Sequence, residues 1–383
     1  MALHFSKEEF HKRKLNTLKH MKEQNLDALL IFRQESMYWL TGYDTFGYVF
    51  FQTLILDQKG NVILLTRAPD LRQAQNTSNI EDIRIWVDKD GINPTNDLKI
   101  ILNELNLKGK KIGVEYEAYG MTGRNALKLN KSLDGYCDVE DQSELITKLR
   151  VIKSNEEIIY VKKAAELADS ALDEAWKYTK AGASESKILA EMQRVIFEGG
   201  GDYPANEFII GSGHNALLCR YQSEKRNLSP TDQLSLEWAG TYKHYHSAMF
   251  RTIPIGKVDP KHIKMHEACA EALTNCSDNL VPGKTAGDIF DIHAKTFDDL
   301  GFNKARMNAC GYSLGSTFAP NWMDWPMLYT GNPYTIEPGN IFFMHMILMD
   351  SENQLAMNLG ETYLVTDNGN ERLGKQKLDL VVL

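Results

Sequence analysis

Residues able to carry acid–base chemistry gather in two neighbouring segments of the second half of the chain. Glu237 is a lone carboxylate in an apolar run, and His244 and His246 lie in the segment 243–252. That segment is typical of a strand whose successive side chains alternate between faces, so both histidines would share one face. We expect the strand with Glu237 to precede it across a short connection at 239–241. A carboxylate and an imidazole would then meet without a metal ion, and the imidazole can move protons near neutral pH.

Other polar side chains suit the binding of a small charged molecule. Arg220, which is followed by Tyr221, offers a planar fork of donors that matches a carboxylate. Aromatic faces together with a carboxylate attract cations, and one short segment supplies both as Trp322, Asp324 and Trp325. A zwitterionic or cationic molecule with a delocalised charge fits this set of groups.

Each candidate also has a purely structural interpretation. Glu237 could pair with a buried arginine, and His246 could satisfy a local hydrogen bond. His345 lies within the apolar run 342–347 and could be a core histidine. The tryptophans could equally be core residues. A catalytic Glu237 could attack a substrate carbon itself or deprotonate the water that does so.

Composition excludes several classes of partner. Lys and Arg number 43 against 51 Asp and Glu, for a net charge of −8, which argues against a nucleic-acid partner. No apolar run approaches the ~20 residues of a membrane span, and the first 20 residues contain no apolar signal-peptide core. The 5 cysteines are scattered and never form a CxxC pair, which predicts reduced thiols. We therefore expect a cytoplasmic protein with no membrane partner.

The elements that must position these residues form two groups. Residues 1–150 alternate between helix and strand and predict an α/β domain with a helix at 7–25, strands at 27–32, 49–56, 61–65, 83–87 and 111–115, and a helix at 96–107. The two strands around the turn at 57–60 predict a hairpin. Residues 41–43 are typical of a turn at the end of a strand.

A polar joint at 149–157 separates the second group, residues 151–383. Ser154 or Asn155 could cap a long helix at 156–179, and a second helix is predicted at 184–197. Beyond residue 199 the pattern changes to glycine-rich turns and short strands, with helices at 259–280 and 285–300. This part predicts an α+β domain with antiparallel strands.

Motifs spread over nearly the whole chain, in order, resemble the creatinase/prolidase family. The first is Tyr38-Trp-Leu-Thr-Gly-Tyr43, and the joint Val151-Ile-Lys-Ser-Asn-Glu-Glu-Ile158 is similar to the start of the family's catalytic domain. The others are Gly211-Ser-Gly-His-Asn-Ala216, Leu236-Glu-Trp-Ala-Gly240, Arg251-Thr252, Gly311-Tyr-Ser-Leu-Gly315, Ile336-Glu-Pro-Gly339 and Leu364-Val-Thr366. The resemblance implies a pita-bread fold for the second domain and a homodimer, which a solution mass of two chains would show.

Metal-dependent members of this family use two Asp, one His and two Glu to hold two divalent ions that activate water. The resemblance places this chain's residues at those positions as Glu237, Ala248, Tyr312, His345 and Gly360, with Glu361 beside the last. Alanine and glycine offer no side-chain ligand, and the other three do not make a carboxylate-rich cage. The resemblance therefore implies no metal and no cofactor, as in the creatinase and ectoine hydrolase branches.

Within the family, the segments 200–204, 236–240 and 311–315 resemble the ectoine hydrolase branch most. This implies hydrolysis of a C–N bond in a small cyclic or linear amidine, with ectoine opened to N-acetyl-diaminobutyrate. The alternatives are a creatinase-type guanidine hydrolase, an enzyme like the Xaa-Pro dipeptidases, and a non-catalytic binding protein with this fold. Creatinase keeps histidines where Arg220 and Tyr312 stand here, which argues against creatine.

The resemblance thus assigns roles to the residues named above. The catalytic candidates are Glu237, His246, His345, Glu361 and Tyr312. The substrate-binding candidates are Arg220, Tyr221, Trp322 and Asp324, together with Tyr43, Asp44 and Phe46, which belong to a segment that in relatives reaches the site of the other subunit.

Overall fold

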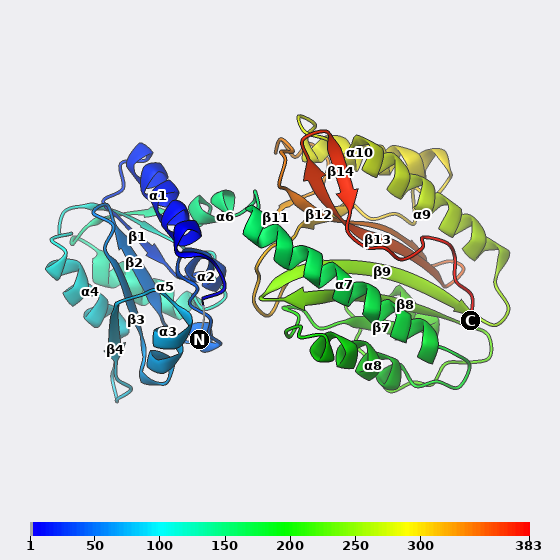
Figure 1. The fold of residues 1–383 in the computed structure, drawn as a ribbon, viewed down its shortest axis with the longest axis horizontal. Helices are drawn as coiled ribbons and strands as arrows, with labels where there is room; N and C mark the ends of the chain where they lie inside the picture. Colours follow the sequence, from blue (N-terminus) through cyan, green and yellow to red (C-terminus); the bar gives the residue numbers. More distant parts are fainter. Residues whose placement is uncertain (1–2) are drawn as a thin grey trace. The chain divides into compact units, whose positions relative to one another are not determined.

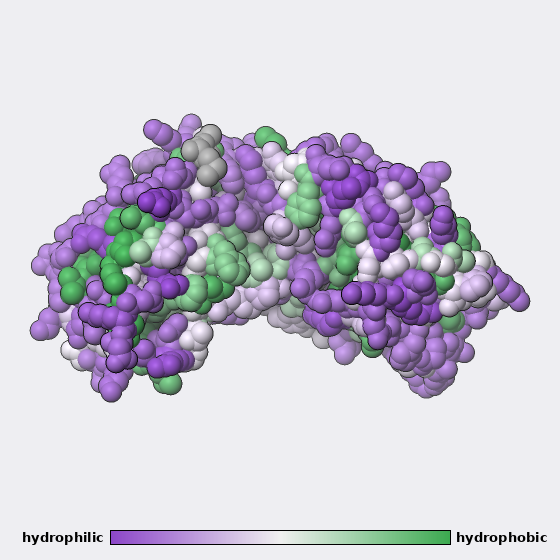
Figure 2. Space-filling model, turned by 90° about the horizontal axis from the view of Figure 1, so that it is seen from below, coloured by the Kyte–Doolittle hydropathy of each residue, from purple (hydrophilic) through white to green (hydrophobic). Residues whose placement is uncertain are grey.

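The computed structural model describes residues 3–383, and it divides into two compact units, Met1–Arg150 and Val151–Leu383 (Figure 1). No helix in the described range is both long and apolar enough to cross a bilayer. One face of the surface is largely hydrophilic, with apolar side chains in separate patches (Figure 2). Among the exposed apolar side chains of the N-terminal unit are Phe46, Val49 and Phe50.

In the described part of the N-terminal unit, six strands form a mixed sheet in the order β4-β3-β2-β1-β5-β6. The strands are β1 (Ala28–Ile31), β2 (Thr53–Asp57), β3 (Val62–Arg67), β4 (Asp82–Trp86), β5 (Lys111–Val114) and β6 (Asp138–Asp141). The predicted hairpin is confirmed as the antiparallel pair β2–β3. The other elements are α1 (Lys7–Glu23), α2 (Gln34–Thr41), η1 (Gly47–Val49), η2 (Ala68–Asp70), α3 (Leu71–Thr77), α4 (Pro94–Glu104), α5 (Gly123–Leu133) and α6 (Leu145–Leu149).

The prediction of a strand-end turn at 41–43 is wrong, because the preceding segment is helix α2. Gly42 follows the helix with a φ of 80°, the left-handed conformation that commonly ends helices. Its N–H donates to the carbonyl of Tyr38. Every residue of α2 is buried. A helix without a solvent-facing side lacks the polar stripe that would reveal its period in the sequence.

In the C-terminal unit, the described strands form an eight-stranded antiparallel sheet. Its order is β11-β10-β12-β13-β9-β8-β7, with β14 paired to β13. The strands are β7 (Ile209–Ser212), β8 (Asp232–Tyr242), β9 (Tyr245–Ile255), β10 (Gly311–Ser313), β11 (Asp324–Met327), β12 (Ile341–Asp350), β13 (Leu355–Thr366) and β14 (Gly369–Arg372). The other elements are α7 (Asn155–Tyr178), α8 (Glu185–Glu198), η3 (Gly213–Leu217), α9 (Pro260–Asn279) and α10 (Ala286–Asp299).

The first helix of this unit begins as the sequence predicts. The Ser154 hydroxyl accepts the N–H of Glu157, and the Glu157 carboxylate accepts the N–H of Ser154 in return. Such a reciprocal cap satisfies two backbone donors that the helix itself leaves unpaired. It fixes where the long helix α7 starts to cross the sheet (Figure 1).

Helices α7, α8, α9 and α10 pack on one face of this sheet. The Trp238 indole of β8 donates to the carbonyl of Ala168 in α7 (3.0 Å), and Ser212 of β7 donates to Glu185 of α8. Met344 and Met346 of β12 join the core beneath α9 and α10. Since side chains alternate along a strand, the residues between these point to the opposite face, which we call the open face.

The turn between β8 and β9 differs from the prediction. The connection expected at 239–241 is wrong, because β8 continues to Tyr242 and the turn consists of Lys243 and His244. Both residues have positive φ, 49° and 65°, as two-residue hairpin turns require. His244 is therefore a turn residue and not a strand residue. Neither position carries the glycine or asparagine that would have marked the turn.

Candidate active site

Strand register brings the predicted residues into one row on the open face. Glu237 on β8 pairs with Phe250 on β9, and Phe250 pairs with Gly360 on β13. Gly360 pairs in turn with His345 on β12. Tyr312 on β10 lies on the same face. It pairs with Phe343 of β12, which is two residues before His345. The open face therefore gathers Glu237, Tyr312 and His345 from segments far apart in the sequence.

Glu237 is the half-buried carboxylate of this cluster. The Tyr312 hydroxyl donates to its Oε1 at 3.2 Å. Burial raises the pKa of Glu237 to about 7, while the Tyr312 hydrogen bond and the nearby Arg220 guanidinium act in the opposite direction. Arg220 itself is exposed, in the turn that follows η3. Near neutral pH this carboxyl can therefore both accept and return a proton, as a general acid–base group must.

Several rings pack around Tyr312, the residue that contacts the Glu237 carboxylate. Tyr312 is buried, and its pKa lies well above the usual value because of burial and the adjacent Glu237 charge. Its ring centroid is 5.6 Å from His345 and 5.5 Å from Phe343. The buried Trp322 donates its indole N–H to the Tyr312 oxygen at 2.8 Å. A carboxylate beside an aromatic ring suits a delocalised cation.

His246 is fully buried near the turn end of β9. Its Nε2 accepts the backbone N–H of Ala205 at 2.9 Å, and its Nδ1 lies 3.2 Å from the Thr317 hydroxyl. Burial lowers the pKa of His246 to about 3, so the ring stays neutral. Both ring nitrogens are thus held by the protein, and the ring lies beside Trp322, with the two ring centroids 6.3 Å apart.

His345 differs from His246 in its hydrogen bonding. It is 9% exposed, and burial lowers its pKa to about 4. Its Nδ1 has no hydrogen-bond partner among residues 3–383. This nitrogen is itself buried, so the neutral imidazole beside Tyr312 carries a polar atom that the described residues leave unsatisfied.

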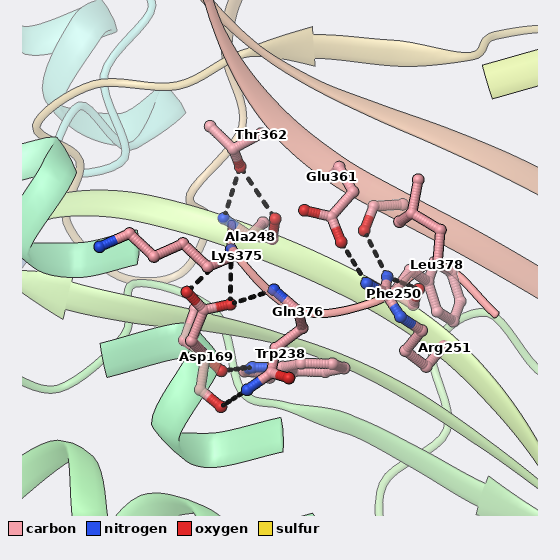
Figure 3. Close-up of polar contacts among 12 residues, drawn as sticks. Asp169, Trp238, Ala248, Phe250, Arg251, Glu361, Thr362, Lys375, Gln376 and Leu378 are labelled. Atoms are coloured by element: carbon pink, nitrogen blue, oxygen red, sulfur yellow. Dashed lines mark hydrogen bonds and ion pairs between the residues drawn. The ribbon is translucent and has the colours of Figure 1, made fainter. Parts of the chain in front are cut away.

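Glu361 does not join this cluster. It follows Gly360 on β13, so its side chain points to the helix-covered face. There it forms an ion pair with Arg251, which also donates to the carbonyls of Phe250 and Gly360 at 2.9 Å each (Figure 3). The ion pair links β9 to β13 on the helix-covered face, opposite the row of side chains that contains Glu237. Its role is therefore to stabilise the sheet.

The other predicted residues of the C-terminal unit are dispersed. Tyr221 packs against Gly211, and its hydroxyl donates to Glu224 at 2.8 Å. Asp324 is buried on β11 and accepts the N–H of Trp325 at 3.0 Å. None of these contacts involves Glu237.

The three candidates from the N-terminal unit differ in exposure. Tyr43 is fully buried, and its hydroxyl donates to Gln52 at 3.2 Å, so its side chain faces the core of its own unit. Asp44 is half-buried, and its N–H donates to Thr77. Phe46 is 73% exposed.

Two residues of the cluster were not predicted. Phe343 alternates with Phe342 and Met344 in an apolar strand, and its position two residues before His345 was the available signal. Thr317 links His246 to the carbonyl of Trp322, from which it lies 3.4 Å. Nothing in the sequence marks this hydroxyl, since the link depends on the path of the loop before β11.

The sequence also matches two family models in succession. Residues 13–152 match the creatinase/prolidase N-terminal domain. Residues 160–367, more than half of the chain, match the metallopeptidase family M24. The chain belongs to the M24 family. Its two units thus have the creatinase N-terminal and pita-bread folds that the resemblance implied.

Relatives of known name support a hydrolase. The ectoine hydrolase of Halomonas elongata is 26% identical over 391 residues, which cover 97% of each chain. The Xaa-Pro dipeptidase of Pyrococcus horikoshii is 25% identical over 379 residues, or 95% of this chain and 97% of the dipeptidase. Among solved structures, a prolidase from Thermococcus sibiricus superposes with a TM-score of 0.88 at 21% identity, over 98% of this chain and 99% of that one.

The residues of this M24 protein do not fit a two-metal centre. Of the five positions that the sequence resemblance aligns with the family's metal ligands, Ala248 and Gly360 offer no side-chain donor atom. A Cβ added at Gly360 would lie 2.8 Å from the Phe343 ring, so that ring leaves no room for a larger side chain at position 360. The described residues contain no group of three or more His, Cys, Asp or Glu side chains arranged to hold a metal ion. The family's metal chemistry therefore has no matching donor set here.

Proposed function

We propose that this protein hydrolyses a C–N bond of a small cyclic amidine without a metal ion, opening ectoine to N-acetyl-diaminobutyrate. The observation that carries the proposal is Glu237, a carboxylate whose pKa is raised to about 7 where the family's metal site would be. The ectoine hydrolase relative, similar over nearly the full length, supports the choice of substrate. Amidinium charge would be repelled by two divalent ions and is attracted by a single carboxylate.

The proposed reaction needs one group that first takes and then gives a proton. Glu237 removes a proton from water, and the water oxygen forms a bond to the amidine carbon. The protonated Glu237 then donates to one ring nitrogen, and the bond between that nitrogen and the carbon breaks. The former water oxygen becomes the amide carbonyl, and its remaining proton ends on the released amine.

Recognition of the substrate uses the surroundings of Glu237. Arg220 is exposed and close enough to lower the pKa of Glu237, so its guanidinium can bind a substrate carboxylate at the mouth of the site. We assign contact with the planar cation to the Tyr312 ring, whose hydroxyl donates to Glu237. The direct test is to incubate the purified protein with ectoine and follow the N-acetyl signal by NMR. Turnover of Xaa-Pro dipeptides or creatine with none of ectoine would contradict the proposal.

Chelation should leave the activity intact. Because the described part of the chain contains no group of side chains able to hold a metal ion, we expect EDTA treatment to change turnover by less than about twofold. Elemental analysis should find less than about one transition metal ion per chain. Activity that is lost with EDTA and regained with manganese or zinc would contradict the proposal.

Activity should rise with pH through neutrality. The active form of a general base is the carboxylate, and burial raises the pKa of Glu237 from 4.5 to about 7. Below that value the group is protonated, so kcat/KM should fall about tenfold per pH unit on the acid side and level off above about pH 8. An acid limb with a midpoint at the ordinary glutamate value would contradict a general base with a raised pKa at Glu237.

A further inference from the structure

A series of hydrogen bonds leads from the backbone of Ala205 to the Glu237 carboxylate. In the first half of this series, the donor and the acceptor of each bond can be assigned. A backbone N–H can only donate, so Nε2 of His246 accepts from Ala205 and the ring's proton resides on Nδ1. That Nδ1–H donates to the Thr317 oxygen, and the Thr317 hydroxyl donates onward to the carbonyl of Trp322 (3.4 Å). The loop that carries Trp322 is thereby held to β9.

The second half of the series has a fixed direction as well. The indole N–H of Trp322 can only donate, so the Tyr312 oxygen is its acceptor at 2.8 Å. Because the bond from Trp322 occupies a lone pair of the Tyr312 oxygen, the Tyr312 hydroxyl proton points to the Oε1 atom of Glu237, 3.2 Å away. Trp322 is 1% exposed and Tyr312 is 4% exposed, so water does not compete readily for either bond. Consecutive bonds of this kind polarise and strengthen one another.

We propose that Trp322 is a positioning residue for Glu237, and that it acts by fixing the direction in which the Tyr312 hydroxyl donates. Tyr312 is then a permanent donor to the reacting carboxylate. This role rests on the proposed function only in naming Glu237 as the reacting group, because the hydrogen bonds belong to the protein without substrate. His246 stabilises the same series from its far end and is not the proton carrier.

Among residues 3–383, three groups with polar or charged atoms act on Glu237. The Tyr312 hydroxyl and the Arg220 guanidinium favour its charged form. The Cys219 thiol is also near, since the Glu237 charge raises the pKa of that thiol. Removing the Trp322 N–H leaves Arg220 and Cys219 unchanged and frees the Tyr312 hydroxyl to rotate. The charged form of Glu237 then loses part of its stabilisation.

The test replaces Trp322 with Phe and measures the titration of Glu237 directly. Infrared spectra of protein with carbon-13 labelled glutamate carboxyls, recorded against pH, would follow the group, and the band lost in Glu237→Gln identifies it. A hydrogen bond to a charged group changes a pKa by about one unit, so partial loss should raise that of Glu237 by at least ~0.5 pH unit. The acid limb of kcat/KM should move up equally.

Trp238→Phe is the matched control. Trp238 is as buried as Trp322 and also donates its indole N–H, but to Ala168 on the helix-covered face. The Trp238→Phe substitution should lower the stability about as much as Trp322→Phe does, and it should leave the pKa of Glu237 unchanged. Tyr312→Phe supplies a second arm. If Trp322 acts through Tyr312, adding Trp322→Phe to Tyr312→Phe should shift the titration no further.

The proposal would be overturned if the pKa of Glu237 were unchanged in Trp322→Phe. It would also be overturned if the pKa shifts of Trp322→Phe and Tyr312→Phe were additive in the double variant. Should Trp322→Phe not fold, 3-benzothienylalanine at position 322 removes the N–H and keeps the ring shape. These outcomes do not depend on whether the proposed function is correct. Absence of ectoine turnover in the wild type would defeat that function, yet the titration of Glu237 could still be measured.

Discussion

Replacing Glu237 with Gln is expected to lower turnover at least ~10²-fold while leaving the melting temperature unchanged or slightly higher. Glutamine keeps the size of the side chain and can still accept the Tyr312 hydrogen bond, but it cannot take a proton from water. General-base roles contribute ~10²–10⁴ to rate. Since burial disfavours the charged form, removing the charge does not destabilise the fold. Initial rates with ectoine and a thermal unfolding curve on the same preparation give both quantities.

The opposite pattern would support a structural role for Glu237. Near-normal turnover in a destabilised variant would contradict the catalytic assignment. Mass spectrometry of the wild type quenched during turnover adds a further distinction, because a general base forms no bond to the substrate. A substrate-derived mass added to the peptide of Glu237 would make the carboxylate a nucleophile instead.

Replacing Glu361 with Gln should have the reverse effect and reduce stability by ~3–5 kcal/mol. The substitution leaves the buried Arg251 guanidinium without a neutralising charge, and an uncompensated buried charge is costly. The turnover of the folded fraction should stay within about threefold of wild type, because Glu361 lies on the face opposite Glu237. Urea unfolding gives the free energy, and activity at low temperature gives the turnover.

Glu371→Gln is a suitable comparison for Glu361→Gln. Glu371 also forms an ion pair, with Lys162, but both side chains are about half exposed. Exposed pairs contribute ~0–1 kcal/mol, so this variant should unfold nearly as the wild type does. A Glu361→Gln protein with full stability and lost turnover would mean that Glu361 takes part in the reaction.

Most helices and strands could be predicted because their signals are local. The Ser154 and Glu157 cap, and the hairpin of β2 and β3, depend on a few consecutive residues. Helix α2 could not be predicted, since its burial on all sides removes the contrast between polar and apolar faces. The turn at Lys243 and His244 was missed because its positive φ angles fall on residues that carry no turn signal.

Only the part of the site that follows from the alternation of side chains along strands could be predicted from the sequence. Alternation and family spacing place Glu237, Tyr312 and His345 together, and the register of β8, β9, β13 and β12 agrees. The same alternation, applied to Glu361 beside Gly360, would have placed that carboxylate on the opposite face. The partners of His246 come from loops, Ala205 and Thr317, whose paths are set by tertiary contacts.

Phe343 has a consequence for protein engineering at this site. The ring lies 2.8 Å from where a side chain at Gly360 would begin, and Phe250 lies 3.0 Å from the same point. A glutamate placed at position 360 would collide with them, and overpacking a core commonly costs ~1–3 kcal/mol. A carboxylate at this position is therefore compatible with the sheet only if residue 343 is smaller. Engineering a metal centre here would need at least that change together with an acidic residue at 248, because neither substitution alone supplies both the space and the donor atoms.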